Sequence, residues 1–420
     1  MLGSPLAFSL LSVALIVNLI SVFIIIRNSR HGYAGLLYCI YNIFFFIAPS
    51  LVHVYNNIFP FYSMPYPSDL QDSAAFIVLC FTIFFFFGFF FSKAKPILSF
   101  KGREISKAKF KIFFFPCIFI LTLTIGYLGI GNFIVKRSDF DIEYIGQGPF
   151  AYAALVFYRV LGFYLLFFVI ASGKKTIGPK YFLYLIAALL IFLVVNFPLA
   201  LPRYMLFAYI LAFVFFSYQP QSKYKLILFS GFFVGVVTLF PFINFITRGG
   251  SAGISVLEYY ATSGDFDGFQ SVMNVIAYVE AKGLSYGYQL LGVILVFIPR
   301  EVWPSKPFAT GQSAAEFMGY PFTNISAPFV SELYVDFGAL GATIGAFIFG
   351  VLLRKIDAGT ILYRKDGDVV SRSLVAIICA FAIIFLRGSL IGVIANISLF
   401  VITCLIIGLF ITRKRRKNAC

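Results

Sequence analysis

Long apolar runs alternate with short polar segments along most of the chain. A membrane-spanning helix needs about 20 mostly apolar residues, and about eleven runs (ten to twelve) approach this length. They cover residues 5–26, 33–55, 72–92, 110–130, 150–172, 181–197, 203–217, 225–246, 328–353, 370–386 and 389–411. The pattern predicts an all-α polytopic integral membrane protein in which the whole chain, 1–420, forms a single transmembrane domain.

Composition supports this interpretation. Of the 420 residues 60% are hydrophobic and 12% are charged, whereas soluble domains are roughly 45–50% apolar and about 25% charged. The six cysteines form no CxxC or CxxH spacing. Neither a disulfide framework nor a zinc site is therefore predicted.

The charged residues predict an orientation. The segments that follow the first, third, fifth, seventh and ninth runs, together with the tail, hold 24 of the 33 basic residues, whereas 13 of the 17 acidic residues fall on the other side. By the positive-inside rule, the basic segments lie in the cytoplasm, the N-terminus outside and the C-terminus inside. This distribution accounts for the net charge of +16 without a nucleic-acid partner.

One long polar interval, residues 247–327, interrupts the apolar pattern and is predicted to be a large periplasmic loop with short helices. One of these helices is expected where Asp267 and Gln270 resemble a capping pair. The piece 289–298 is too short to span a membrane, so it lies in the interface or re-enters. Four apolar residues of the capped helix recur at helical spacing: Phe269, Val272, Ile276 and Val279.

Arginines gather at the outer ends of the predicted spans, on the side that the positive-inside rule depletes. A single arginine there is equally well explained by snorkelling to the interface. Four around one loop instead favour a ligand with phosphate oxygens, because guanidinium groups bind these in a bidentate way and keep their charge. We therefore expect a lipid-linked phosphate or diphosphate to bind near Arg159, Arg203, Arg248 and Arg387.

Carboxylates are the candidate bases. Glu332 and Asp336 are four residues apart and so share a helical face, while three glycines on the opposite face are expected to pack against a neighbouring helix. The two carboxylates are then expected to face a cavity or the overlying loop, where one could act as a general base, although a charged helix entry in the headgroup zone explains them too. The glycines are Gly338, Gly341 and Gly345.

Other polar residues in the loop give weaker signals. Asp265 is a second candidate base, and aromatic residues including Trp303 are compatible with stacking on sugar rings or with an interfacial aromatic belt. His53 is the one histidine on the outer side and is more typical of a structural role. The sequence lacks metal-ligand spacing and a phosphate-cradling glycine loop, so no metal or cofactor is expected. Neither repeats nor helices broken at mid-membrane are apparent, which disfavours a secondary transporter.

Short motifs in the second half of the chain resemble the Wzy-type O-antigen and capsule polymerases, which join oligosaccharide repeat units. Their order along one chain makes the resemblance fairly specific, and the first half matches only in hydropathy. The motifs are Asn196-Phe-Pro with Pro202-Arg203, Asp265-Phe-Asp-Gly-Phe-Gln270, Gly283-Leu-Ser-Tyr-Gly287, Gln289-Leu-Leu-Gly292, Phe297-Ile-Pro-Arg300, Trp303-Pro-Ser-Lys-Pro307, Thr310-Gly311, Ser331-Glu332, Asp336-Phe-Gly338 and Gly341.

The resemblance implies a membrane glycosyltransferase in the bacterial inner membrane with its active site on the periplasmic side. Its donor and acceptor would be undecaprenyl-diphosphate-linked oligosaccharides, and a chain-length regulator protein would be a further partner. Members often have an even number of helices, from which the count of eleven departs. The product, O-antigen, capsule or another glycan, is left open.

Residue roles follow as a hypothesis. Arg203, Arg248 and Arg300 would hold the diphosphate and stabilise it as it leaves, and Glu332 or Asp265 would accept the acceptor's proton. The remaining substrate-binding candidates are Lys306, Arg159, Asp336, Trp303 and Arg387. A flippase for lipid-linked glycans and a membrane acyltransferase are the alternatives. The one-sided collection of charges favours an enzyme over a flippase, and His53 alone is thin support for an acyltransferase.

Overall fold

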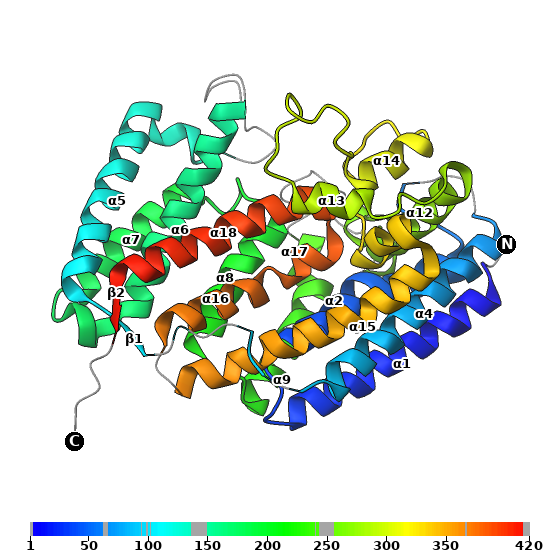
Figure 1. Cartoon of the computed structure of the whole chain (residues 1–420), viewed down its shortest axis with the longest axis horizontal. Helices are drawn as coiled ribbons and strands as arrows, with labels where there is room; N and C mark the ends of the chain where they lie inside the picture. The colour runs from blue at the N-terminus through cyan, green and yellow to red at the C-terminus, as the bar shows by residue number, and fades with distance from the viewer. Residues whose placement is uncertain are drawn as a thin grey trace.

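The chain is almost entirely helical in the computed structural model, which describes residues 3–61, 66–93, 95–97, 100, 102–135, 149–239, 241–242, 256–365 and 368–414 (Figure 1). Up to residue 239 the elements are α1 (Pro5–Arg27), α2 (Ala34–Tyr41), the π-helical η1 (Asn42–Ile47), α3 (Ala48–Asn56), α4 (Ser68–Phe91), β1 (Arg103–Ile105), α5 (Lys107–Leu128), η2 (Ile130–Asn132), α6 (Pro149–Ile177), α7 (Tyr181–Val195), α8 (Arg203–Ser217), α9 (Ser222–Val234) and the π-helical η5 (Gly235–Leu239). From residue 256 they are α11 (Val256–Thr262), η6 (Gly264–Phe266), α12 (Gly268–Lys282), α13 (Tyr288–Ile294), α14 (Thr310–Phe317), α15 (Phe329–Lys365), α16 (Val369–Ala380), α17 (Ala382–Arg387), α18 (Leu390–Ile411) and β2 (Thr412–Lys414).

Eight helices in this described part are long and apolar enough to cross a membrane, and α7 and α8 are shorter apolar helices. Each of the eleven predicted runs coincides with helix. The eighth run, 225–246, corresponds to α9 and η5, which continue to the edge of the described residues. The prediction of an all-α, multi-pass membrane protein is therefore confirmed, whereas the number eleven stays a prediction. The spans are Pro5–Arg27, Ala34–Asn56, Ser68–Phe91, Lys107–Leu128, Ala154–Ile177, Phe329–Leu362, Val369–Arg387 and Leu390–Ile411.

Two glycines allow the long helices α4 and α15 to touch. A Cβ on Gly88 would lie 2.1 Å from the carbonyl oxygen of Phe347, and a Cβ on Gly350 would lie 2.1 Å from that of Phe85. Small residues let helix backbones approach closely within a membrane. These contacts join α4 and α15 into one layer with α1, at the lower right of Figure 1.

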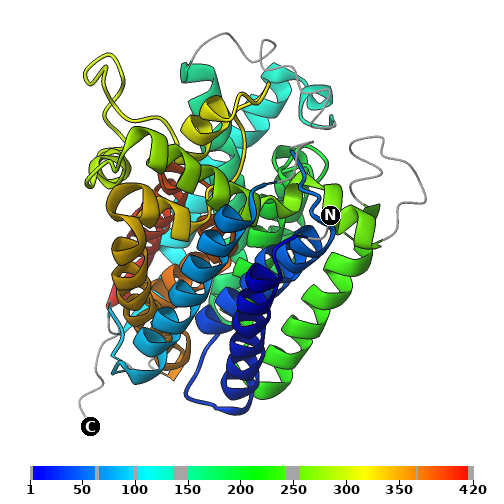
Figure 2. The ribbon, with the colours of Figure 1, turned by 90° about the vertical axis from the view of Figure 1, so that its right-hand side faces the viewer.

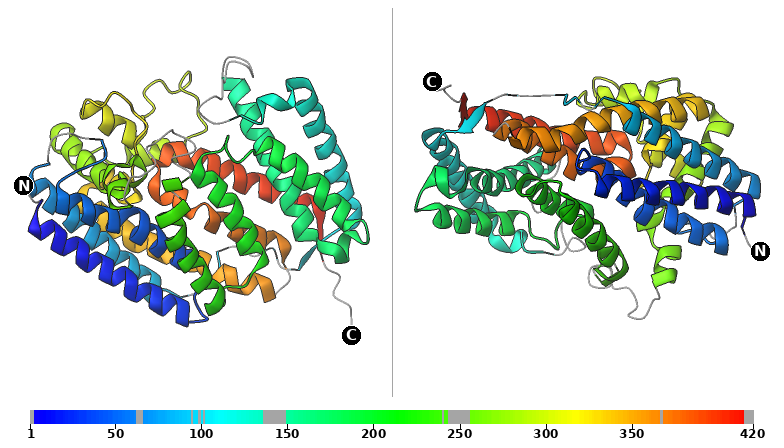
Figure 3. Two further views of the ribbon diagram at one scale, coloured as in Figure 1. Left: turned by 180° about the vertical axis from the view of Figure 1, so that it is seen from behind. Right: turned by 90° about the horizontal axis from the view of Figure 1, so that it is seen from below.

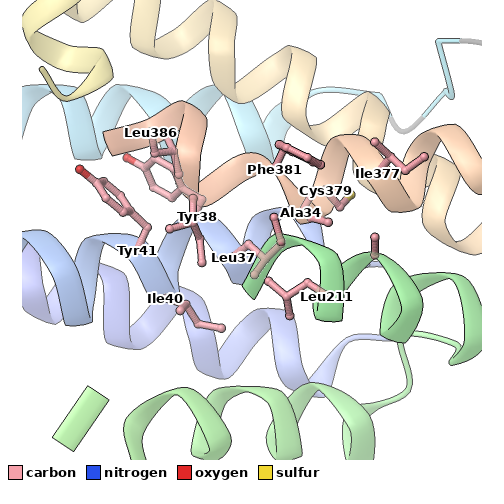
Figure 4. Packing of buried hydrophobic residues seen from close by; sticks show 14 of the residues in the cluster. Ala34, Leu37, Tyr38, Ile40, Tyr41, Leu211, Ile377, Cys379, Phe381 and Leu386 are labelled. Atoms are coloured by element: carbon pink, nitrogen blue, oxygen red, sulfur yellow. The ribbon is translucent and has the colours of Figure 1, made fainter. Parts of the chain in front are cut away.

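The helix α2 lies at the centre of the fold, and all eight of its residues are buried. Its side chains Leu37 and Tyr38 face Leu211 of α8 on one side and Phe381 and Leu386 of the α16–α17 segment on the other (Figure 4). The π-helical turn η1 continues α2 directly. The central position explains why this run is apolar on every face.

The basic segments meet at one end of the molecule. Arg354 donates to the carbonyl oxygen of Arg30 (2.9 Å) and to Nδ1 of His31 (3.0 Å), and the buried Asp357 accepts hydrogen bonds from the N–H groups of Gly32 (2.7 Å) and Ala34 (3.0 Å). At the same end β1 pairs with β2 in antiparallel register, and this pair lies at the bottom left of Figure 1. The structure thus gathers the basic residues as the charge pattern requires; which side faces the cytoplasm stays a prediction.

The described part of the polar interval lies at the opposite end. Figures 1 and 2 show α12, α13 and α14 above the long helices. The helix predicted around Phe269 is α12, and Phe269, Val272 and Ile276 are buried. The capping prediction is wrong: Asp267 precedes α12 but its side chain caps no N–H of the helix. Gln270 instead accepts a hydrogen bond from the Phe61 N–H at 3.1 Å.

A sharp break divides α15 at Gly338, whose φ of 65° and ψ of −159° are not helical. The first segment turns back on the second, so that a Cβ on Gly341 would lie 2.1 Å from Cβ of Phe337, and one on Gly345 would lie 2.5 Å from Leu333. One prediction is therefore wrong: the glycines accommodate the start of their own helix rather than a neighbouring helix. The break near the start of α15 is one that the apolar pattern does not reveal.

Replacing Gly338 with alanine tests the break. This φ and ψ combination is essentially restricted to glycine, and a side chain there costs about 1–3 kcal/mol. We expect Gly338→Ala to lower the free energy of unfolding by that amount, measured by denaturant titration in micelles. Gly126→Ala on α5 is the control, since its Cβ would meet nothing within 4 Å. Equal stability of both variants would contradict the strained turn.

Acidification tests the buried His31. Burial, together with the nearby Arg354 and Lys225, lowers the pKa of His31 from 6.5 to about 4, and Asp357 lies 3.9 Å away without offsetting them. Between pH 6.5 and about 4 the unfolded chain therefore binds more protons at His31 than the folded protein does. The folded state loses stability as the pH falls through this range. Between pH 7 and 4.5 the loss is about 2 kcal/mol. We expect His31→Gln to remove this part of the pH dependence in thermal unfolding; an unchanged slope would contradict it.

Candidate functional site

Two buried ion pairs lie side by side at the end that carries the polar interval. In the first, Arg203 Nη2 lies 2.9 Å from Oδ1 and 2.7 Å from Oδ2 of Asp265. The hydroxyl of Tyr259 donates to Oδ2 at 2.8 Å, and that of Ser263 donates to the same oxygen at 3.2 Å. The Arg203 side chain is 12% exposed and that of Asp265 is 6% exposed. One guanidinium and two hydroxyls therefore hold this carboxylate away from solvent.

The second pair joins Arg387 and Asp267, with Nη2 3.2 Å from Oδ1. The same guanidinium donates to the carbonyl oxygen of Gly264 at 2.8 Å and stacks over the ring of Tyr204 at 4.8 Å. The second carboxylate oxygen of Asp267 accepts the Ser326 N–H at 2.8 Å. Arg387 thus binds the turn that carries both aspartates.

Local sequence places each arginine at a helix end. Arg203 begins α8 directly after Pro202, whose extended backbone ends the preceding turn. A cation at a helix N-terminus opposes the helix dipole, so Arg203 requires an anion, and Asp265 supplies it. Arg387 is the last residue of α17, where a cation is favoured by the dipole.

The four charged residues form a neutral cluster, which we call the outer ion-pair cluster: Arg203, Asp265, Asp267 and Arg387. Burial raises the pKa of Asp267, while Arg387 and the Ser326 N–H act in the opposite direction. Burial, followed by the charge of Asp265, also raises the pKa of Tyr259 to about 12. Tyr259 is therefore protonated at neutral pH and acts as a donor.

Asp336 is hydrogen-bonded to the start of α13. Its Oδ1 accepts the N–H groups of Gly287 (3.1 Å) and Gln289 (3.0 Å), its Oδ2 accepts that of Leu290 (2.9 Å), and the Ser285 hydroxyl donates to Oδ1. These are the otherwise unpaired donors at the start of α13. Asp336 therefore caps this helix, and its predicted role in substrate binding stays a prediction.

Glu332 has a similar structural role. Its Oε2 accepts the hydroxyl of Thr310 at 2.8 Å, and its Oε1 accepts the N–H of Leu390, the first residue of α18, at 3.0 Å. It is 1% exposed. Of the two surroundings expected for Glu332 and Asp336, a cavity or the overlying loop, the structure shows the loop: both carboxylates accept hydrogen bonds from the polar interval, Glu332 from Thr310 and Asp336 from residues 285–290. Of the two predicted bases, only Asp265 belongs to the outer ion-pair cluster.

Three further candidate residues, Arg300, Lys306 and Trp303, form hydrogen bonds within the loop to which they belong. Arg300 donates to the carbonyl oxygens of Lys306 (2.5 Å) and Pro307 (3.0 Å), and Lys306 donates to those of Val296 (2.6 Å) and Ile298 (2.9 Å). Burial, and then the charge of Arg300, lowers the pKa of Lys306. Both cations therefore stabilise the proline-rich turn, and their predicted role as diphosphate ligands stays a prediction.

Trp303 completes this turn. Its Nε1 donates to the Ser305 hydroxyl at 3.0 Å, and its ring packs edge-on against Tyr288 with centroids 5.8 Å apart. Tyr288 in turn donates to the Ser305 carbonyl oxygen at 2.6 Å. The aromatic pair supports the loop's own conformation, which is a different role from the predicted stacking on sugar.

Arg159 and Arg248 are the two remaining candidate arginines, and only Arg159 lies within the described residues. Arg159 lies on α6, where its carbonyl oxygen accepts the Asn196 side-chain amide at 3.1 Å. Arg248 lies outside the described residues. His53 is fully buried on α3, with Nε2 2.8 Å from the Tyr260 carbonyl oxygen. That position supports the structural interpretation of this histidine.

The sequence interpretation missed partners that lie far from the arginines in the chain. Tyr259 and Ser326 complete the outer ion-pair cluster, and neither has a charge or a motif spacing to mark it. The only sequence signal for Tyr204, whose ring lies under Arg387, is that it follows Arg203 directly in the chain. A second polar group lies beside the cluster, where Gln270 donates to the hydroxyls of Tyr66 (3.0 Å) and Tyr320 (3.1 Å). Within the described ranges, no three His, Cys, Asp or Glu residues are placed to hold a metal ion.

A double-mutant cycle tests the second ion pair. Arg387→Gln leaves the Asp267 carboxylate buried without its cation, which costs about 3–5 kcal/mol. We expect Asp267→Asn to offset part of this loss, with a coupling free energy of about 0.5–3 kcal/mol between the two positions. The measurement is the free energy of unfolding of the single and double variants in mixed micelles. Additive effects would contradict a direct pair.

Comparison of the chain with protein-family models, with curated proteins and with solved structures gives no match.

Proposed function

We propose that this protein polymerises lipid-linked oligosaccharide repeat units at the outer face of a bacterial inner membrane. The growing chain would move from its lipid diphosphate to a sugar hydroxyl of the next lipid-linked unit. The observation that carries the proposal is the outer ion-pair cluster, with two guanidinium groups less than a quarter exposed at the end opposite the basic segments. The order of motifs that resembles the Wzy-type polymerases supports the same substrate class.

Diphosphate binding requires an arginine of the cluster to change its anionic partner. A neutral cluster does not attract a diphosphate by net charge, so binding requires Arg203 or Arg387 to exchange a carboxylate oxygen for a phosphate oxygen. Guanidinium groups suit this exchange because carboxylates and phosphates fit the same bidentate geometry. Exchange at Arg203 releases Asp265 from its guanidinium partner and leaves it the hydrogen bonds from Tyr259 and Ser263.

The freed Asp265 carboxylate is the proposed general base. The bond between the sugar C1 and the diphosphate oxygen breaks, a bond forms between C1 and the acceptor oxygen, and the acceptor's proton passes to Asp265. The lipid diphosphate leaves with its charge held by the arginines, and such preorganised electrostatic stabilisation is commonly a large part of catalysis. Glu332 is the alternative base; its carboxylate is bound to Thr310 and to the N–H of Leu390.

A flippase for lipid-linked glycans is the second candidate, favoured by the break of α15 at Gly338. Broken helices occur where transporters bind substrates. The two charged ends of the structure favour the enzyme, because a flippase moves its charged cargo across the whole membrane. An acyltransferase receives no support from His53, which is fully buried.

A deletion strain separates these functions. On a gel of surface polysaccharide, loss of a polymerase leaves one repeat unit per lipid, whereas loss of a flippase leaves none at the surface. We expect the first pattern. Long polymer at normal yield in the deletion strain would contradict the proposal.

Arg203→Lys tests the site in the same strain. The lysine keeps the charge but loses the bidentate geometry, so we expect polymer yield to fall by about a hundredfold, the typical loss when one transition-state donor is removed. Lys282→Ala is the matched control, since Lys282 is an exposed cation in the last turn of α12. Membrane abundance is compared by immunoblot. Normal polymer from Arg203→Lys would overturn the assignment of this arginine.

A further inference from the structure

An apolar groove separates α8 from α9 and has a cavity volume of about 460 Å³. Ligand sites typically enclose roughly 300–1,000 Å³, so the groove is large enough for part of a lipid. Ile210 on one wall is 50% exposed, and Ile227 on the other is 57% exposed. The left view of Figure 3 shows these two green helices on the near face of the molecule. The groove therefore opens sideways, toward the surrounding lipid.

The wall formed by α8 leads directly to the outer ion-pair cluster. Its groove residues follow Arg203 at intervals of three or four, which places the arginine at the head of the same helical face. From Phe207 to Tyr218 the helix rises about 16 Å, roughly half the thickness of a hydrocarbon core of about 30 Å. The stripe is Phe207, Ile210, Leu211, Val214 and Tyr218. A cation thus stands at one end of an apolar channel as long as one leaflet.

The wall formed by α9 is open because it lacks two side chains. Gly231 and Gly235 both line the groove, and a Cβ on Gly231 would meet nothing within 4 Å. The neighbouring Phe232 and Val236 close the floor. Gly231 is therefore not needed for close helix packing, and its missing side chain leaves room for a ligand.

We propose that this groove holds the isoprenoid chain of the lipid diphosphate substrate, with its diphosphate at Arg203. The assignment rests on the proposed function. It commits to the lipid carrier because the apolar channel and the phosphate-binding arginine lie on one face of α8. The diphosphate would reach Arg203 while the isoprenoid chain lies along the groove, so the substrate enters laterally from the membrane.

Photolabelling tests the groove directly. The probe is a polyprenyl diphosphate with a diazirine in its isoprenoid chain, added to the purified full-length protein in nanodiscs of neutral phospholipid. We expect the label to map to peptides within residues 207–236. Gly231→Leu fills the groove and displaces several methylene groups, so labelling there should fall about tenfold or more.

Gly126→Leu on α5 is the matched control, because it also adds a side chain where nothing lies within 4 Å, away from the groove. It should label as the unsubstituted protein does. Equal labelling of Gly231→Leu, or label confined to other helices, would overturn the groove. Competition by phosphatidylglycerol as strong as by unlabelled polyprenyl diphosphate would identify a general lipid site and overturn the carrier assignment.

The two proposals fail in different ways. Unchanged labelling of Gly231→Leu, with a polymer defect in the deletion strain, overturns the groove and leaves the function. Unchanged polymer in the deletion strain overturns the function, and with it the identity of the lipid, whatever the label shows. Loss of both label and polymer length in Gly231→Leu, with neither lost in Gly126→Leu, supports both.

Discussion

Each buried carboxylate among the described residues has several hydrogen-bond donors, and the arrangement of the helices depends on that requirement. An ionised group removed from water is costly unless it is paired and hydrogen-bonded. Asp336 and Glu332 satisfy it at the starts of α13 and α18, and Asp357 does so at the start of α2. Asp265 and Asp267 use arginines instead. These acids therefore help to fix where helices begin, and at the polar end the two aspartates Asp265 and Asp267 hold arginines that a ligand can take over.

This division explains why the outer ion-pair cluster differs from the rest of the polar end. A carboxylate that caps a helix cannot leave without exposing backbone donors, so Asp336 and Glu332 are structural. A carboxylate paired with a guanidinium can be replaced by another anion of similar geometry. The candidate site is thus the place where arginines are held in neutral ion pairs. It lies close to the end of the groove between α8 and α9 that is nearest Arg203.

Much of the fold was predictable from the sequence, because apolar runs of about 20 residues have few alternatives in a membrane. The end of the molecule at which Arg354 lies followed from the charge pattern. Arg203 and Asp265 were each named as candidate site residues from their residue types and positions. The pairings were not predictable. Glu332 and Asp336 share a helical face as expected, but whether a carboxylate caps a helix or faces a cavity depends on contacts 22 to 58 residues away. The break at Gly338 was missed because the apolar pattern continues through it.

The pairing of β1 with β2 has a consequence for how the protein is made. Residues 103–105 leave the ribosome long before residues 412–414, their partners in the sheet. The N–H of Ser106, just before α5, likewise waits for the carbonyl oxygen of Ile411 at the end of α18 (2.9 Å). These hydrogen bonds at the start of α5 therefore form only after α18 has been made. Until then the start of α5 is held by its packing on α6 and α7 alone, for example through Phe110 and Tyr184.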